Sequence, residues 1–227
     1  MALLKDKISN IPKDAVILSR QDALKHQADV LRKWKHTSDV WPIRYGGAIL
    51  ASFSAITGMY INNYYRTRFK LFQYGKISSY LPICVLPAVM SLTLHTELVL
   101  PGVILQDECV LCTELRASSI QASMGLVFPT VLAPISIFSL ALRYGTYDIP
   151  YLLKEPMKAF NLWKIQTKPI ANILFGIFIA QALAGSIVTY LEAKAIEKLR
   201  SKNYQHIFSL FVMDLLFEDD IVQIKKG

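Results

Sequence analysis

The sequence predicts an all-α, polytopic membrane protein with four transmembrane helices. Four apolar stretches, at about residues 45–62, 77–94, 117–142 and 169–191, are long enough to cross a bilayer. A helix rising about 1.5 Å per residue needs ~20 residues for ~30 Å of hydrocarbon. None of these stretches has an ionisable side chain at its centre. Ion pumps and transporters of charged substrates normally keep such groups inside the membrane, so the pattern favours packing against another molecule over transport.

The rest of the chain is too short for a sizeable soluble core. Of 227 residues, 53% are hydrophobic and 19% are charged. We expect an N-terminal amphipathic tail at 1–44, a four-helix transmembrane domain at 45–191 and a C-terminal helical tail at 192–227. The short soluble segments therefore argue against a soluble catalytic domain, and the protein is not expected to be an enzyme.

The N-terminal tail carries no apolar run of the kind found in a secretory signal. Residues 15–34 mix apolar and charged side chains, which predicts an amphipathic helix. Acidic residues are frequent here, unlike in a cleaved mitochondrial presequence: Asp6, Asp14, Asp22 and Asp29. We therefore expect an uncleaved tail with internal targeting.

The net charge of +8 comes mainly from basic residues beside the spans. This placement is typical of charges that set topology and meet anionic lipid, and it argues against nucleic acid. Equal numbers of Lys and Arg are predicted on the two sides of the membrane. The rule that assigns orientation from these residues therefore leaves the orientation of this protein open. The scarcity of acids in the 66–76 loop favours a matrix-like side for that loop.

Small residues recur at spacings that let helix backbones approach closely in lipid. One row lies in the first predicted span and one in the fourth: Gly47, Ala51 and Gly58, then Gly176, Ala180 and Ala184. Each row predicts either packing among the protein's own helices or an interface with a partner subunit. Both predictions can hold, because there are two rows.

The second and third spans each contain two prolines at the same separation: Pro82 and Pro87, then Pro129 and Pro134. Proline removes a backbone donor, so these spans are predicted to kink. Paired broken helices also occur in transporters, but no substrate-binding carboxylate accompanies these prolines.

Beyond the fourth span the helical pattern continues as a solvated extension that includes Glu192 and Lys194. Residues 207–217 are too short to span and are interrupted by Asp214. They are either an interfacial helix or a docking segment for a partner protein.

The pair Cys109 and Cys112 is the main candidate for chemistry. Tetrahedral zinc needs further ligands that this sequence does not place nearby, so no metal or cofactor is expected. The acids Asp107, Glu108 and Glu114 should disfavour a reactive thiolate. A structural disulfide or two free thiols is therefore the prediction. His95 and Glu97, near the end of the second span, are interpreted as polar residues at the membrane interface.

Several motifs together resemble the transmembrane protein 126 family. They are CVLCTELR with Cys109, Cys112 and Arg116; GLVFP with Pro129; ALRY with Arg143 and Tyr144; and WKIQTKP with Trp163, Lys168 and Pro169. The first span is also similar, with Gly58, Asn62 and Arg66 before a basic loop. The paired cysteines look more like the A-type member.

The resemblance implies a multi-pass protein of the mitochondrial inner membrane that helps to assemble the membrane arm of respiratory complex I. Such a factor would act by binding, in a chaperone-like way, with membrane-arm subunits, other assembly factors and lipid as partners. Two alternatives stay open: a permanent accessory subunit or insertase-associated factor, and a membrane thiol–disulfide oxidoreductase that uses Cys109 and Cys112.

Overall fold

The computed structural model describes residues 19–34, 36–106, 109–147 and 155–224, with side chains described through residue 201. Within these ranges the chain is helical and contains no strand. The elements are α1 (Arg20–Arg32), α2 (Thr37–Arg68), α3 (Lys76–Tyr80), η2 (Leu81–Val85), α4 (Leu86–Leu94), η3 (His95–Val99), α5 (Leu100–Leu105), α6 (Val110–Ala122), η4 (Ser123–Val127), α7 (Phe128–Tyr144), α8 (Pro156–Thr167), η5 (Lys168–Ile170) and α9 (Ala171–Ile224).

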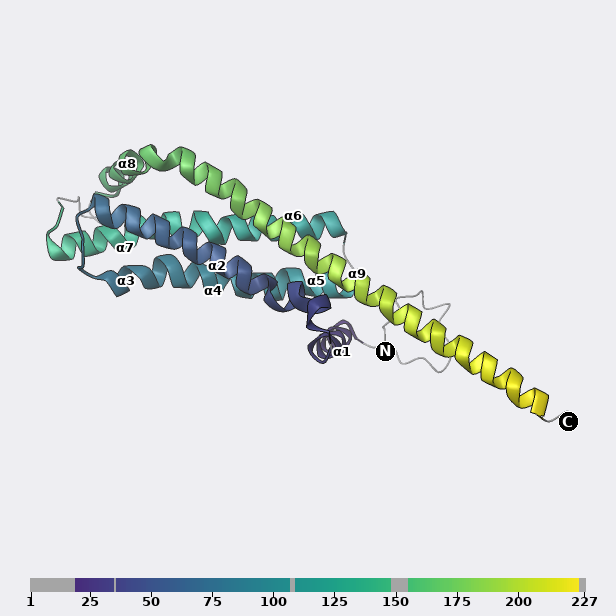
Figure 1. The fold of residues 1–227 in the computed structure, drawn as a ribbon. Coiled ribbons are helices and arrows are strands. Elements are labelled where there is room, and N and C mark those ends of the chain that lie inside the picture. The colour runs from purple at the N-terminus through teal and green to yellow at the C-terminus, as the bar shows by residue number, and fades with distance from the viewer. Residues whose placement is uncertain (1–18, 35, 107–108, 148–154, 225–227) are drawn as a thin grey trace.

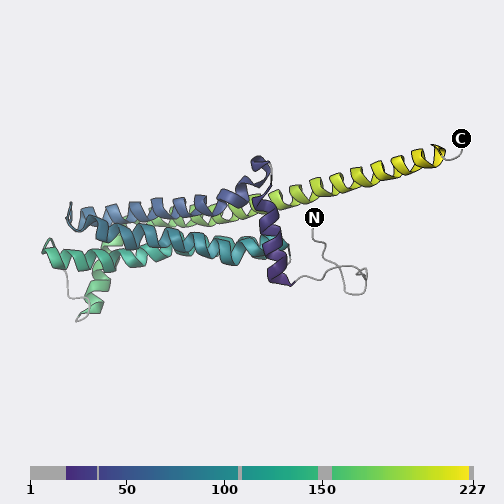
Figure 2. The ribbon, with the colours of Figure 1, turned by 90° about the horizontal axis from the view of Figure 1, so that it is seen from below.

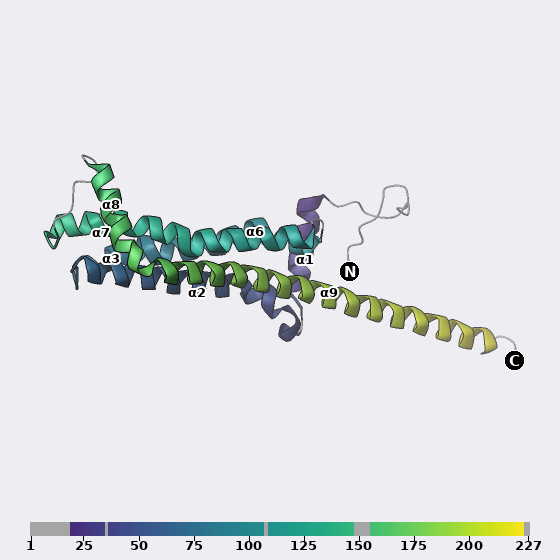
Figure 3. The ribbon, with the colours of Figure 1, turned by 90° about the horizontal axis from the view of Figure 1, so that it is seen from above.

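The long helices form an elongated bundle (Figure 1). Its rods are α2, the run from α3 to α5, the run from α6 to α7, and the first part of α9, which continues well beyond the bundle. The short helices α1 and α8 lie across the bundle axis at opposite ends (Figures 2 and 3). The sequence predicted only a connection where α8 forms.

Among the described residues, three helices are long and apolar enough to cross a membrane: Lys76–Leu105, Val110–Tyr144 and Pro156–Ser201. They contain the second, third and fourth predicted spans. Helix α2 holds the first predicted span and has 32 residues, but it is not among the three. Its polar residues Ser54, Thr57 and Asn62 are all buried in the bundle, and they lower its hydropathy.

The prolines lie in helical runs that continue past them. Pro82 falls inside the π-helical turn η2, and Pro129 is the second residue of α7, which begins directly after the π-helical turn η4. A π turn shifts the hydrogen-bond register by one residue, so the helix can accommodate a position without an N–H. Pro134 lies inside α7. The predicted kinks stay a prediction.

One buried arginine organises the turn between α2 and α3. The guanidinium of Arg66 donates to the carbonyl oxygens of Phe72 at 2.6 Å and Tyr74 at 2.9 Å, and to the hydroxyl of Ser79 at 2.9 Å. Gly75 closes the turn with φ of +57°, a conformation that glycine adopts without a steric cost. The family-like Arg66 therefore has a structural role at this end of the bundle.

The largest apolar core lies at the same end, beneath α8. It includes Tyr65, Phe69 and Phe138, with Ala159 of α8 packed against them. The Tyr65 hydroxyl lies 2.6 Å from the Thr167 hydroxyl, which ties α2 to the end of α8.

The C-terminal part of the chain is a single helix, α9. Residues 207–217 lie within it, but their side chains are outside the described part, so the choice between an interfacial helix and a docking segment stays open. The predicted domain boundaries also stay predictions.

Candidate functional site: a polar seam and an open helix face

A hydrogen-bonded seam of polar side chains runs through the middle of the bundle. The Ser91 hydroxyl donates to Gln121 Oε1 at 2.6 Å, and Gln121 Nε2 donates to Gln181 Oε1 at 2.6 Å. Gln181 Nε2 then donates to the Thr57 hydroxyl at 2.8 Å. The seam joins α4, α6, α9 and α2, and all its members are buried. It satisfies polar groups that would be costly in lipid.

A second polar contact, between His95 and Glu192, lies farther along the bundle. His95 Nε2 is 3.0 and 3.1 Å from the two Glu192 carboxylate oxygens, and both side chains are buried. Gly46 of α2 makes room for it, because a Cβ there would lie 2.5 Å from a Glu192 oxygen. Glu97, in contrast, is exposed.

This pair corrects two expectations. Glu192 is sealed inside the bundle and is not part of a solvated extension, and His95 pairs with it rather than sitting at the interface beside Glu97. A signal was present in the sequence: Gln181, Gly185, Val188 and Glu192 follow a four-three-four spacing, so they share one helical face. The structure buries all four.

The small-residue row of α2 points into the bundle. A Cβ on Gly58 would collide with the carbonyl oxygen of Ile83 in η2, and one on Gly47 would lie 2.8 Å from Leu92. Ala51 is half-buried. These residues let α2 approach the run from α3 to α5 closely.

The small-residue row of α9 points away from the bundle. A Cβ added to Gly176 meets nothing within 4 Å, Ala180 is exposed and Ala184 is half-buried. On the same helix, Gly185 does pack inward, since a Cβ there would lie 2.9 Å from the Ala117 carbonyl oxygen of α6. Within the described residues, the row Gly176, Ala180 and Ala184 thus lies on a face of α9 that no other helix covers completely.

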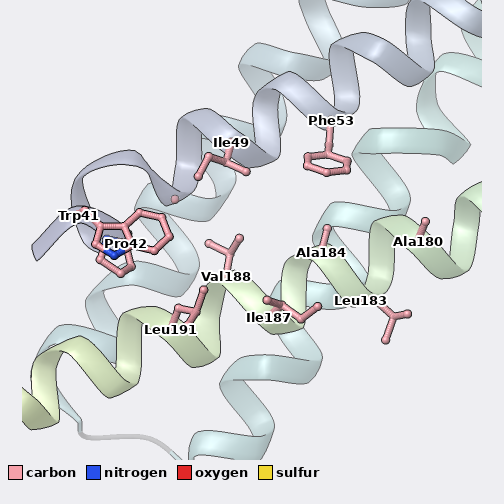
Figure 4. A pocket seen from close by; sticks show the side chains of 11 residues that line it. Trp41, Pro42, Ile49, Phe53, Ala180, Leu183, Ala184, Ile187, Val188 and Leu191 are labelled. Carbon is pink, nitrogen blue, oxygen red and sulfur yellow. The ribbon is translucent and has the colours of Figure 1, made fainter. Parts of the chain in front are cut away.

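An apolar groove of about 420 Å³ continues this face between α2 and α9 (Figure 4). Its α2 wall includes Trp41, Ile49 and Phe53, and its α9 wall includes Ala180, Ala184 and Leu191. Every lining residue is apolar. We call the groove together with the row Gly176, Ala180 and Ala184 the open face.

Cys109 and Cys112 lie at the start of α6. Both are exposed free thiols, and Cys109 occupies the N-cap position. The polar hydrogens of Cys112, first its backbone N–H and then its thiol, favour a negative Cys109 sulfur and lower the pKa of the Cys109 thiol.

The expectation that acidic neighbours disfavour a thiolate stays a prediction, because the structure describes only one of the three acids, Glu114. The Glu114 carboxylate accepts a hydrogen bond from Ser186 of α9 at 3.4 Å, so it is turned toward that helix. Asp107 and Glu108 lie outside the described residues.

The family-like residues do not gather in one place. Arg116 donates to the Leu98 carbonyl oxygen at 3.0 Å, near the cysteine end of the bundle. At the other end, the Arg143 guanidinium lies 6.0 Å from the Tyr144 ring centre, and Tyr144 stacks on Tyr74.

The remaining family-like residues lie in α7, α8 and η5. Pro129 is buried at the start of α7, and Trp163 of α8 packs against Phe160 with ring centres 5.3 Å apart. Lys168 and Pro169 are exposed and begin the three-residue turn η5 before α9. Over the described ranges, no group of three or more His, Cys, Asp or Glu residues is arranged to hold a metal ion.

These features define a helical membrane protein with a hydrogen-bonded polar seam inside the bundle and large apolar side chains exposed on its surface. The model of the family "Transmembrane protein 126" matches residues 26–206. The chain belongs to this family.

Three relatives agree with this assignment. Transmembrane protein 126 of Drosophila melanogaster is 37% identical over 91% of this chain and 94% of its own length. Transmembrane protein 126A of Rattus norvegicus is 27% identical over 63% of this chain and 71% of its own length. The Mus musculus protein of the same name is 28% identical over 56% of this chain and 63% of its own length. No solved structure matches the chain.

Proposed function

We propose that the protein is a mitochondrial inner-membrane assembly factor that binds intermediates of the respiratory complex I membrane arm and promotes their assembly without catalysis. The compartment and the client follow from what the family resemblance implies. The observation that carries a binding role is the open face of α9, an apolar surface with small residues that α2 covers only in part.

In this proposal α2 is a fourth membrane span. Its polar residues Ser54 and Thr57 point inward and are satisfied by the seam, while Phe53, Ile56 and Met59 are exposed. The exposed surface of α2 is therefore more apolar than the helix as a whole. The side-by-side placement of α2 and α9 along the bundle supports the same reading.

The mechanism is holding rather than turnover. A transmembrane helix of an unassembled membrane-arm subunit would lie against Gly176 and Ala180, where the absence of large side chains allows backbones to approach. The apolar groove would take larger side chains of that helix. Packing of this kind shields a client surface until the next module arrives.

Complexome profiling of mitochondria tests the proposal. Cells lacking the protein would be rescued with the wild type, with a Gly176→Leu and Ala180→Leu double variant, or with Ser139→Leu, which changes an exposed small residue on α7. We expect the wild type and the α7 control to migrate with subcomplexes smaller than complex I and to restore its assembly, and the α9 variant to do neither.

Other migration patterns overturn the proposal in distinct ways. Migration only with the finished enzyme would make the chain a permanent accessory subunit. Association with the insertase or ribosome would make it an insertase-associated factor. Normal complex I in cells without the protein would remove the complex I role altogether.

A further inference from the structure

The cysteine pair at the start of α6 has a geometry that the proposed binding role does not use. Cys109 is the N-cap residue, with φ −61° and ψ 128°, and Cys112 is one turn further on. The Cys109 carbonyl oxygen accepts hydrogen bonds from both the backbone N–H and the hydroxyl of Thr113, each at 3.1 Å. These bonds fix Cys109 at the positive end of the helix, where a thiolate is stabilised.

The two cysteines are not equivalent. Cys109 sits at the N-cap, before the first helical residue, whereas Cys112 lies inside the helix. Such asymmetry is what distinguishes an attacking cysteine from a resolving one. Cys84, the third cysteine, is buried in η2 and serves as an internal reference.

We propose that Cys109 and Cys112 form a redox-active dithiol that exchanges with disulfides, Cys109 being the attacking residue and Cys112 the resolving residue. The inference goes beyond the proposed binding function and does not depend on it.

The exchange has two steps. The Cys109 thiolate attacks one sulfur of the incoming disulfide, forms a mixed disulfide with it and expels the other sulfur as a thiolate, which takes up a proton. The Cys112 thiolate then attacks the Cys109 sulfur, closes the Cys109–Cys112 disulfide and expels the second thiolate. The incoming disulfide gains the two electrons and two protons that the cysteine pair loses.

The full chain in detergent micelles, treated with oxidised glutathione, tests this. In Cys112→Ser, a glutathione adduct should accumulate on Cys109. In Cys109→Ser, the adduct on Cys112 should form at least about threefold more slowly at pH 7, because Cys112 lies inside the helix and not at the N-cap position. The wild type should pass through the adduct to the internal disulfide and release both glutathione molecules as thiols. Peptide mass spectrometry reads each state, and Cys84 should stay unmodified.

Equal adduct rates on Cys109 and Cys112 would overturn the assignment of roles. Stable adducts on both cysteines of the wild type, with no internal disulfide, would overturn the dithiol itself. In cells, acid-quenched Cys112→Ser should run as a reducible species of higher mass if the natural disulfide belongs to a protein. A glutathione adduct alone would instead identify the small-molecule disulfide as the source.

Discussion

Helices α2 and α9 carry similar rows of small residues, but the row of α2 faces the inside of the bundle and the row of α9 faces outward. On α2, Gly47 and Gly58 face inward, and an added methyl group on Gly58 would strike the backbone of η2. On α9, Gly176 faces open space and Ala180 is exposed. The same residue type therefore closes the bundle in one helix and leaves a surface uncovered in the other.

The difference shows what holds this bundle together. Lipid is as apolar as the outward side chains, so burial of apolar surface adds little to helix association in a membrane. Close backbone approach at Gly58 and Gly185, and hydrogen bonds through Gln121 and Gln181, supply the adhesion. The open face of α9 has the close-approach residues but no polar contact, which suits a reversible contact.

The largest expected effect on stability concerns the buried pair of His95 and Glu192. His95→Leu should lower the free energy of unfolding by about 3–5 kcal/mol, because Glu192 is left buried without its partner. Unfolding by denaturing detergent in mixed micelles measures the change. The double variant with Glu192→Leu should recover most of the loss, and equal losses in the single and double variants would contradict this account.

The next effect compares the two glycine rows directly. Gly58→Ala should destabilise the bundle by about 1–3 kcal/mol, because the new methyl group collides with the Ile83 carbonyl of η2. Gly176→Ala is the matched control and should be neutral, or stabilising by up to about 1 kcal/mol, since glycine is a poor helix former. Equal unfolding curves for the two variants would break the comparison.

A smaller effect is expected in the seam. Gln181→Met keeps the length of the side chain but removes its bonds to Gln121 and Thr57. Hydrogen bonds between membrane helices contribute about 0.6 kcal/mol on average and about 1.7 at most, so a loss of roughly 1–2 kcal/mol should appear in the same unfolding assay. Thr93→Ala, which removes an exposed hydroxyl bonded only within α4, should change almost nothing. A similar loss of stability in both variants would contradict the proposed contribution of the seam's hydrogen bonds.

The smallest effect on stability, and the sharpest on function, belongs to the open face. Ala180→Leu should leave unfolding almost unchanged, because Ala180 is exposed and lines an open apolar groove with room for a larger side chain. It should nevertheless reduce recovery of complex I in cells that lack the native protein. Full recovery with this variant would mean that the open face meets only lipid.

Much of the fold followed from the sequence alone. The apolar runs located the helices that are apolar enough to span, because length and hydropathy are local properties of a stretch. The ordered motifs identified the family, since they are themselves sequence features. Spacing also identified both small-residue rows and the cysteine pair. It did not predict α8, whose place depends on contacts with the distant residues Tyr64 and Tyr65.

Only the tertiary structure decided which side of each helix faces inward. Helical periodicity shows which residues share a face, but the neighbouring helix and the lipid are both apolar, so hydropathy does not distinguish them. The sequence therefore predicted that Glu192 belongs to a solvated extension, whereas the structure places its distant partner His95 beside it. The two small-residue rows were indistinguishable in sequence for the same reason, and three-dimensional packing put one inside the bundle and the other outside it.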